Sequence, residues 1–341
     1  MPSLKYLIKR ISKMDYSSML NRVNLVNIKT RKPKALIFLD MIWSGIVYGA
    51  GYVDYDVIGF YKLNHKQRTT MLTRAKNDKI VKKLNNKDYW HLFNNKNEFN
   101  EYFSDFIYRD WIYLKKEKNN ENTINIFKDF ISKNPIFFAK PNDGQCGKGI
   151  EKIDTATIDI SADRLLQDLQ KKGLELYEAP IIQNDIMNEL NNSSVNTIRM
   201  VTVMNEQNEV TILASYVRIG NNNIVDNFNS GGMTAKVDIQ SGKIIEDAID
   251  KNGDVYKYHP TTNTQIIDFQ IPYYNESKEM VKKAAKLSKN VRYVGWDVAI
   301  SSNGPTLVEG NQYPGHDIYQ VAEKIGKNDL GVWPEFKKAM K

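Results

Sequence analysis

The chain contains 341 residues, and its most informative stretch runs Gly295-Trp296-Asp297-Val298-Ala299-Ile300, followed after a polar turn by Leu307-Val308-Glu309-Gly310-Asn311. Apolar residues flanking Asn303-Gly304 predict a β-hairpin. With the turn centred on Asn303, Asp297 and Glu309 are cross-strand neighbours. Asn311 shares a face with Glu309, because side chains alternate along a strand.

Three oxygen-bearing side chains are therefore expected on one side of this hairpin. Mg²⁺ takes oxygen ligands and bridges carboxylates to phosphates, so Asp297, Glu309 and Asn311 are the predicted metal ligands. The alternative is two carboxylates on a solvated face. Apolar neighbours such as Val298 and Leu307 favour strands inside a core.

A second informative stretch is Phe138-Ala139-Lys140-Pro141-Asn142-Asp143-Gly144-Gln145-Cys146-Gly147-Lys148-Gly149-Ile150. A strand that ends in lysine and continues into three glycines suits a triphosphate, because glycines let backbone N–H groups approach the oxygens. The spacing differs from that of a Walker loop. The alternative is a surface turn.

A third group of segments carries two arginines on predicted neighbouring strands, followed by a polar Gly-Gly turn. The segments are Ser194-Val195-Asn196-Thr197-Ile198-Arg199, Ser215-Tyr216-Val217-Arg218 and Val225-Asp226-Asn227-Phe228-Asn229-Ser230-Gly231-Gly232-Met233. Guanidinium groups and turn amides both bind phosphate or carboxylate, so an anion site is predicted here. Solvated surface ion pairs are the alternative.

The composition is that of a folded, water-soluble protein, with 41% hydrophobic and 26% charged residues. The net charge of +8 predicts an anionic partner of some kind. The single cysteine, Cys146, forms no internal disulfide, and a reducing compartment is expected. Neither a signal peptide nor a membrane span is predicted, because the N-terminus lacks a long apolar core and the apolar window 35–51 is too short.

The predicted organisation is a basic segment at 1–34, an aromatic-rich N-terminal domain at 35–120 and a third unit at 121–335. In the first segment, Leu4, Leu7, Ile8 and Ile11 follow helical spacing, which suits a helix lying on an anionic bilayer or packing on its own protein. Helices are expected at 124–132, 161–172 and 278–289. Strands are expected at 136–140, 179–183, 196–204, 210–219, 233–239, 292–300 and 306–309. Mostly antiparallel strands with packed helices indicate an α+β fold.

Taken in order, these segments resemble an ATP-grasp ligase. Within that superfamily the chain most resembles the sugar-transfer-associated ATP-grasp group of bacterial polysaccharide loci. The resemblance is carried by Val195-Asn196-Thr197-Ile198-Arg199, Val225-Asp226-Asn227-Phe228, Val294-Gly295-Trp296-Asp297-Val298-Ala299 and Gly304-Pro305-Thr306-Leu307-Val308-Glu309-Gly310-Asn311. It implies an ATP-grasp fold of two α+β lobes with ATP between them, a lid and hinge lobe at about 135–190 and a catalytic lobe at about 191–335.

The resemblance also implies roles for individual residues. Lys140 would contact the α- and β-phosphates of ATP, and Gly147, Lys148 and Gly149 would form a lid. The segment Gln183-Asn184-Asp185-Ile186 resembles the hinge that reads adenine through its backbone, although many relatives have Glu in place of Gln183. Glu189 is the candidate for ribose, and Asn227, Gly231 and Gly232 for further nucleotide contacts. Asp297, Glu309 and Asn311 would hold Mg²⁺, and Arg199 and Arg218 would act in catalysis.

The implied activity is an ATP- and Mg²⁺-dependent carboxylate–amine ligase that forms an amide through an acylphosphate. A sugar acid or amino acid in capsule or O-antigen synthesis is the expected substrate. The alternatives are a kinase-like phosphotransferase acting on a hydroxyl, and a basic membrane- or nucleic-acid-binding module. No nucleic-acid motif is present, so nucleic acid is not the expected partner. The expected location is cytoplasmic, and peripheral membrane contact through the basic N-terminus is the alternative to packing of that segment on the protein itself. Replacing Asp297 or Glu309 by Ala is expected to abolish turnover and to spare the fold.

Overall fold

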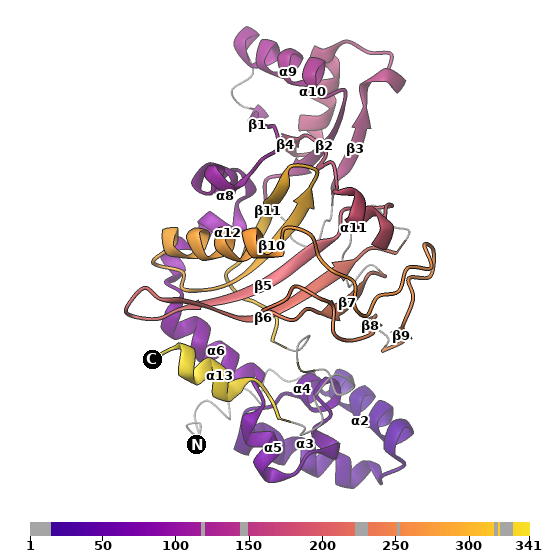
Figure 1. Cartoon of the computed structure of the whole chain (residues 1–341), viewed down its shortest axis with the longest axis vertical. Helices are drawn as coiled ribbons and strands as arrows, with labels where there is room; N and C mark the ends of the chain where they lie inside the picture. The colour runs from indigo at the N-terminus through magenta and orange to yellow at the C-terminus, as the bar shows by residue number, and fades with distance from the viewer. Residues whose placement is uncertain are drawn as a thin grey trace.

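The computed structural model describes residues 15–116, 120–143, 149–221, 231–250, 253–316, 320 and 330–341. Its strands form two antiparallel sheets (Figure 1). The smaller sheet has four strands in the order β1 (Trp111–Tyr113), β4 (Leu174–Glu178), β2 (Ile136–Pro141) and β3 (Glu151–Asp154). The larger has seven, in the order β11 (Gly304–Asn311), β10 (Tyr293–Ser301), β5 (Thr197–Met204), β6 (Val210–Ile219), β7 (Met233–Lys236), β8 (Ala248–Ile249) and β9 (Val255–Tyr256).

Helices dominate the N-terminal part of the described chain. They are α2 (Tyr16–Thr30), α3 (Lys34–Tyr48), α4 (Tyr52–Val57), α5 (His65–Thr70), α6 (Arg74–Leu84), α7 (His91–Asn94) and α8 (Lys96–Tyr102). The later helices are α9 (Glu121–Lys133), α10 (Ala162–Lys171), α11 (Asp185–Leu190), α12 (Tyr274–Leu287) and α13 (Trp333–Ala339). The described part of the chain contains no helix with the length and apolar character needed to cross a bilayer.

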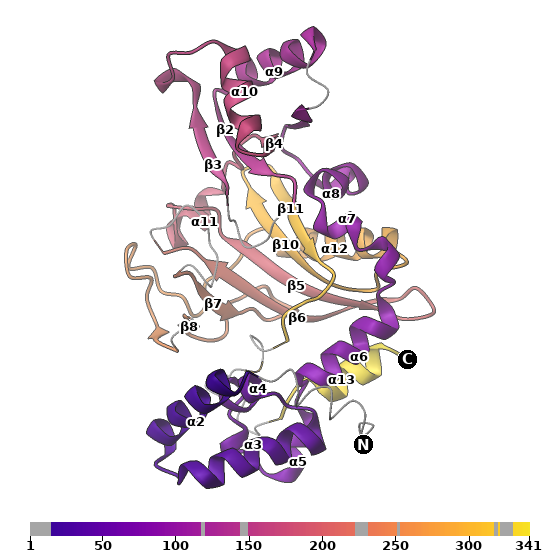
Figure 2. The same cartoon turned by 180° about the vertical axis from the view of Figure 1, so that it is seen from behind.

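The large sheet lies in the middle of an elongated molecule (Figures 1 and 2). The small sheet, with α9 and α10, forms one end, and α2 to α5 form the other. α12 packs in the main core against β5 and β10, where buried Trp296 lies against the rings of Phe93 and Phe103. A second cluster joins α6 and α13 to apolar side chains of the large sheet. The α+β class is therefore confirmed.

Several predicted elements agree with the structure. Helix α10 begins after Ser161, whose side chain caps it, and ends before Gly173, which has the positive φ of 77° that glycine accommodates. The strands predicted at 136–140, 196–204 and 210–219 correspond to β2, β5 and β6. The predicted helix 278–289 instead begins a turn earlier, as α12.

The strand predicted at 179–183 is wrong. The chain forms β4 just before it, from Leu174 to Glu178, and residues 179–183 contain only an isolated bridge from Gln183 to Ser301. Pro180 has no N–H to give to a sheet ladder, which explains why the strand ends where it does. β1 lies before the predicted boundary at residue 120 and pairs with β4, so the N-terminal region contributes a strand to the small sheet.

Asn85 joins the helical region to the hairpin. It is buried, and its Nδ2 donates to the carbonyl oxygens of Tyr293 at 2.7 Å and Gln312 at 2.6 Å. Its Oδ1 accepts from the backbone N–H of Tyr293 at 2.9 Å. One amide side chain therefore fixes the start of β10 and the residue that follows β11.

We predict that Asn85→Ala lowers the free energy of unfolding by about 3 kcal/mol, because each buried polar group left without a partner costs about 1–3 kcal/mol. Urea denaturation followed by circular dichroism measures the change. Lys83→Ala, on the exposed side of α6, is the control and should change stability by less than about 0.5 kcal/mol. Equal losses in the two variants would contradict the role given to Asn85.

Candidate active site

The predicted carboxylate hairpin is present with the predicted register. Asp297 and Glu309 are Cα partners across β10 and β11, and Gly295 is the partner of Asn311. The Asn311 Nδ2 donates to Glu309 Oε1 at 3.2 Å, so these two side chains share a face. A register shift follows directly between Asp297 and Val298. The hairpin thus places the three predicted metal ligands together.

Arginines from the next two strands of the sheet, β5 and β6, form hydrogen bonds with the Asp297 carboxylate. Arg199 on β5 is the Cα partner of Asp297, and its Nε and Nη2 donate to the two carboxylate oxygens, with Nη2 at 2.6 Å from Oδ2. Arg218 on β6 donates from Nη1 to the same Oδ2 at 3.0 Å. Gly295 makes room for this arrangement, because a Cβ there would lie 3.1 Å from Arg199 Cδ.

The burial of Asp297 opposes its charge, but the two guanidinium groups outweigh this and hold its pKa at about 2. Burial likewise opposes the charge of Arg199, and Asp297 raises the Arg199 pKa above its ordinary value. Removing Asp297 would leave two cations poorly solvated. The expectation that Asp297→Ala spares the fold is therefore corrected, and Glu309 is the better position for a functional test.

Glu309 differs from Asp297 in being 52% exposed at its side chain, with Oε1 3.8 Å from Arg199 Nη2. Partial burial of Glu309 against the sheet, followed by the charge of the neighbouring Asp297 carboxylate, raises the Glu309 pKa to about 7. Water reaches this side chain, so the Asp297 charge is the cause that persists at an open surface. A carboxylate destabilised by its neighbour is a group that a bound cation would stabilise.

These donors fit Mg²⁺. In the described residues no cluster of three His, Cys, Asp or Glu side chains forms a metal site. Two carboxylates and one amide oxygen suffice for Mg²⁺, because it keeps several waters and binds substrate phosphates as well. Glu309 and Asn311 have side-chain oxygens that are available to coordinate a metal ion. Both Asp297 oxygens accept from arginines, and Asp297 also shares a side-chain hydrogen bond with Glu309.

The small sheet brings a lysine toward this hairpin. Lys140 on β2 forms an ion pair with Glu178 on β4, and Glu178 also accepts from Arg109 Nη2 at 2.8 Å. Arg109 Nη1 donates to the Leu307 carbonyl oxygen at 2.8 Å, which ties the group to β11. Asn100 Nδ2 completes the set by donating to Glu178 at 2.9 Å.

Glu178 is the buried centre of this second cluster. Burial opposes its charge, but Arg109 and Lys140 hold its pKa well below the usual range for glutamate. Lys96, at the start of α8, donates to the carbonyl oxygen of Pro141 at 3.1 Å. Burial, followed by the nearby charge of Lys140, lowers the Lys96 pKa, whereas Glu309 and Glu178 act in the opposite direction. Lys96 therefore lies between the two sheets, close to both charged clusters.

Glu178, Arg109, Asn100 and Lys96 were not predicted as site residues. The strand expected at 179–183 left Glu178 outside it, and the other three stand in no recognisable motif. Their pairing depends on contacts between residues far apart in sequence, such as the 69 positions between Arg109 and Glu178. For Glu178, the only sequence signal was a charged residue at the end of a strand.

The predicted hinge, Gln183-Asn184-Asp185-Ile186, uses several of its polar groups within the protein. Gln183 Oε1 accepts from the Asn196 N–H at 2.6 Å, and Gln183 Nε2 donates to Asn188 Oδ1 and the Asn191 carbonyl oxygen. The Asn184 N–H donates to the Ile300 carbonyl oxygen, and the Ile186 N–H donates to Asn184 Oδ1. These contacts fix the turn against β5 and β10.

The remaining predicted contacts lie around this turn and the glycine segments. Glu189 is exposed on α11, and its carbonyl oxygen accepts from Thr264 Oγ1 at 2.6 Å. Gly149 and Gly231 have φ values of 77° and 97°, and Gly231 and Gly232 directly precede β7. Gly147, Lys148 and Asn227 lie outside the described residues.

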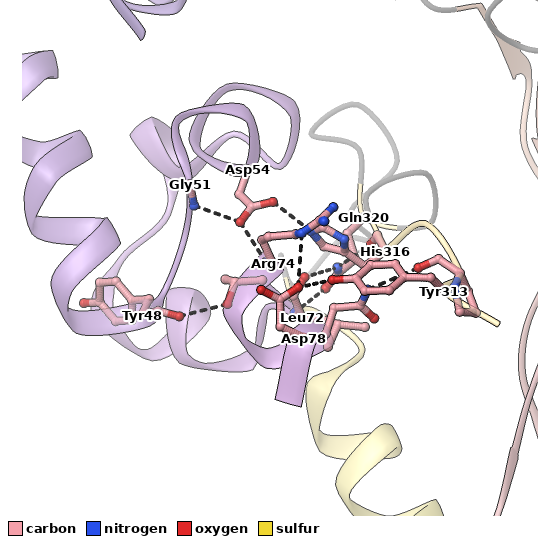
Figure 3. Close-up of polar contacts among 12 residues, drawn as sticks. Tyr48, Gly51, Asp54, Leu72, Arg74, Asp78, Tyr313, His316 and Gln320 are labelled. Carbon is pink, nitrogen blue, oxygen red and sulfur yellow. Dashed lines mark hydrogen bonds and ion pairs between the residues drawn. The ribbon is translucent and has the colours of Figure 1, made fainter. Parts of the chain in front are cut away.

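The segment after β11 is joined to the N-terminal helices by a buried polar cluster, shown in Figure 3. His316 Nε2 is 2.8 Å from Asp54 Oδ1, and Asp54 Oδ2 accepts from the backbone N–H groups of Gly51 and Arg74, each at 2.9 Å. Gln320 accepts from the Leu72 N–H at 2.7 Å and donates to the Leu72 carbonyl oxygen at 2.9 Å. His316 is therefore committed to a structural contact with α4.

An antiparallel sheet that carries a hairpin of acidic and amide side chains, together with a smaller sheet that supplies a lysine, is the architecture of the ATP-grasp class. Residues 75–330 match the family described as sugar-transfer associated ATP-grasp. This match spans most of the chain, and the chain belongs to that family. The predicted fold and family are thus confirmed.

Three similar solved structures illustrate the likeness, each with a TM-score below 0.5. They include the D-alanine–D-alanine ligase of Coxiella burnetii, with 9% identity, a TM-score of 0.39 and coverage of 66% of this chain and 49% of that one. N5-carboxyaminoimidazole synthetase of Staphylococcus aureus in complex with ADP has 13% identity and a TM-score of 0.38, and the match covers 66% of this chain and 46% of that one. Biotin carboxylase of Campylobacter jejuni has 13% identity and a TM-score of 0.43, and the match covers 73% of this chain and 46% of that one. The chain thus spans about half the length of each. A search of curated proteins gave no significant match.

We predict that Glu178→Gln lowers the free energy of unfolding by about 3–5 kcal/mol at pH 7, because it leaves Arg109 and Lys140 without their buried counter-charge. The folded-state pKa of Glu178 is depressed, so its stabilisation is complete above the unfolded pKa of about 4.3 and is lost as the pH falls below it. The deficit should narrow by roughly 2 kcal/mol at pH 3.

Urea denaturation of both proteins at pH 7 and pH 3 measures this difference. Glu101→Gln, at an exposed position on α8, is the control and should be nearly neutral at both values. A deficit that is the same at the two pH values would show that packing, and not the charge of Glu178, holds the small sheet.

Proposed function

We propose that this protein is an ATP- and Mg²⁺-dependent carboxylate–amine ligase. The observation that carries the proposal is the cluster of Asp297, Glu309, Arg199 and Arg218 at one place on the large sheet, in a chain that belongs to an ATP-grasp family. Such a cluster combines open metal donors with fixed cations. Phosphoryl transfer needs this combination, because it depends on positioning and charge neutralisation more than on a protein nucleophile.

In this proposal the cluster around Glu178 and the cluster around Asp297 contact different parts of the nucleotide. Lys140 contacts the α- and β-phosphates, and Gly147, Lys148 and Gly149 cover them. Asp297, Glu309 and Asn311 hold Mg²⁺, which would neutralise the β- and γ-phosphates when bound. Lys96 adds a second cation from the α8 side, and its pKa is lowered by the nearby charge of Lys140, so a bound phosphate would relieve the repulsion between the two.

The proposed adenine contacts come from the turn before α11. Ile182 and Ile186 expose apolar side chains there and offer a surface on which a purine ring can pack. Gln183, Asn184 and Asp185 set the shape of the turn. Glu189 is exposed and can accept from ribose hydroxyls, and Gly231 and Gly232, with Asn227, supply further nucleotide contacts.

The proposed reaction has two steps. A carboxylate oxygen of the first substrate attacks the γ-phosphorus, the bond to the β-phosphate oxygen breaks, and ADP leaves an acylphosphate. The amine of the second substrate then attacks the acyl carbon, phosphate leaves, and the nitrogen loses a proton to give the amide. Arg218 stabilises the transferring phosphoryl group, and its Nε is a buried donor with no hydrogen-bond partner among the described residues. Arg199 stabilises the tetrahedral oxyanion from the side facing away from Asp297.

The finer proposal is that the substrate is a sugar acid or an amino acid used in capsule or O-antigen synthesis in the cytoplasm. It is supported by the description of the family alone. The direct assay measures ADP release with mixed amino acids and uronic-acid sugars, followed by mass spectrometry of the product. An amide retains no phosphate, whereas a phosphorylated hydroxyl would identify a kinase. ATP binding without stimulation by any carboxylate–amine pair would remove the support for a ligase.

We predict that Glu309→Gln reduces turnover by at least about 100-fold, because a metal donor next to the γ-phosphate contributes several kcal/mol of charge stabilisation. The fold should be preserved, since Glu309 is half exposed and its ion pair is long. Glu206→Gln, in the exposed turn between β5 and β6, is the matched control. Thermal unfolding tests the fold, and full activity in the Glu309 variant would contradict the metal assignment.

A further inference from the structure

Helix α3 presents an apolar face to solvent. Leu36, Leu39 and Trp43 are 62%, 61% and 57% exposed, and Ile46 and Val47 continue the same face at helical spacing. The opposite face, with Ile37, Met41 and Tyr48, is buried in the N-terminal helical core. A helix that is apolar on both sides is normally covered on both sides. In the part of the chain that the structure describes, only the face with Ile37, Met41 and Tyr48 is covered.

The surroundings of this face are strongly cationic. Residues 16–70 contain eight Lys or Arg residues and three acidic residues, Asp40, Asp54 and Asp56. All three aspartates are engaged: Asp40 with Arg68, Asp54 with His316, and Asp56 with Arg22 and Lys29. The remaining cations form no ion pair with a carboxylate among the described residues, although the charge of Lys32 also acts on Asp40; they are Arg31, Lys32, Lys34, Lys62 and Lys66.

A surface hollow lies where the end of α2 meets the turn after α4. Lys29, Thr30, Lys32, Tyr61 and Lys62 line it. Lys32 is held in place by donating to the Tyr61 carbonyl oxygen at 2.7 Å. Three ammonium groups around one hollow form an environment that favours phosphate. Lys32 is two residues from the start of α3, so the cationic hollow adjoins the apolar helix in sequence.

We propose that the exposed face of α3 is a docking surface for an anionic lipid bilayer. The helix lies in the plane of the interface, with Leu36, Leu39 and Trp43 among the acyl chains and the lysines at the level of the phosphates. Tryptophan favours this depth, because its ring is apolar and its N–H is polar. At 15 residues, α3 is too short to span the bilayer.

A second copy of the chain is a poorer occupant for this face. A two-fold interface places the same surface opposite itself, so the cations around α3 would face one another. A bilayer containing anionic lipid instead supplies the opposite charge. α3 lies at the end of the molecule opposite the four-stranded sheet (Figures 1 and 2), so vesicle binding can be tested separately from ATP turnover.

Co-sedimentation of the full chain with vesicles of phosphatidylcholine, with and without 30% phosphatidylglycerol, tests the proposal. The protein should bind the anionic vesicles, and the double variant Leu39→Gln/Trp43→Gln should bind about 100-fold more weakly, since each large apolar side chain contributes roughly tenfold. Lys34→Glu/Lys62→Glu should lower binding at least about tenfold. Ile160→Gln/Ile245→Gln removes two apolar side chains elsewhere that are each 47% exposed, and it should leave binding unchanged. Circular dichroism confirms that each variant is folded.

Three results would overturn the proposal. One is unchanged vesicle binding by the folded α3 variant, especially if Lys9→Glu/Lys13→Glu abolishes binding, which would place the contact in the N-terminal segment. Another is a dimer, measured by light scattering after size exclusion, that the α3 variant converts to a monomer. Equal binding of the native protein to neutral and anionic vesicles would exclude the role given to the lysines.

Discussion

The buried carboxylate of Asp297 is the constraint on which the large sheet and its chemistry depend. It lies between two guanidinium groups, and both come from strands that must be adjacent in the order β10, β5, β6. A buried ion costs several kcal/mol unless it is paired, so any register that separates these residues is penalised by the unpaired charge. The same pairing fixes Arg199 and Arg218 in position before a substrate arrives. Preorganised charge of this kind stabilises a transition state without a cost of reorganisation.

Glu178 is held in the small sheet by the same kind of pairing as Asp297 in the large one. It is a second buried carboxylate between two cations, and one of them, Arg109, also binds a carbonyl oxygen of β11. The small sheet is therefore oriented on the large one through a hydrogen bond two residues from Glu309. Lys140 forms an ion pair with Glu178, so a triphosphate bound to Lys140 as we propose would compete with this carboxylate for the lysine. In that proposal, nucleotide binding would be coupled to the contact that positions the small sheet.

The sequence was sufficient for the hairpin because its register follows from local rules. Asn303-Gly304 sets the turn, and alternation then places Asp297, Glu309 and Asn311. It was insufficient for Glu178 and Arg109, because their pairing depends on how two sheets meet. It also could not show that Gln183 binds Asn196 and Asn191, since a buried amide and a ligand-binding amide have the same sequence signature. The proximity of the three proposed metal ligands was thus predictable from the sequence, whereas the groups that hold them in place were visible only in the fold.

Helix α3 illustrates a different limit of pattern analysis. The window 35–51 is too short for a membrane span, and the sequence pattern offers membrane contact only as one of two alternatives for the basic segment before it. Hydrophobic periodicity predicts which face of a helix is buried only when the other face is polar. In α3 both faces are apolar, so the sequence gives no contrast, and only the packing of Ile37 and Met41 identifies the inner face. Part of the net charge of +8 gains a location by the same reasoning, since residues 16–70 carry eight Lys or Arg residues against three Asp residues. All three aspartates are paired, and the lysines and arginines that form no ion pair belong to the same helical region as the apolar face of α3 that the described protein does not cover.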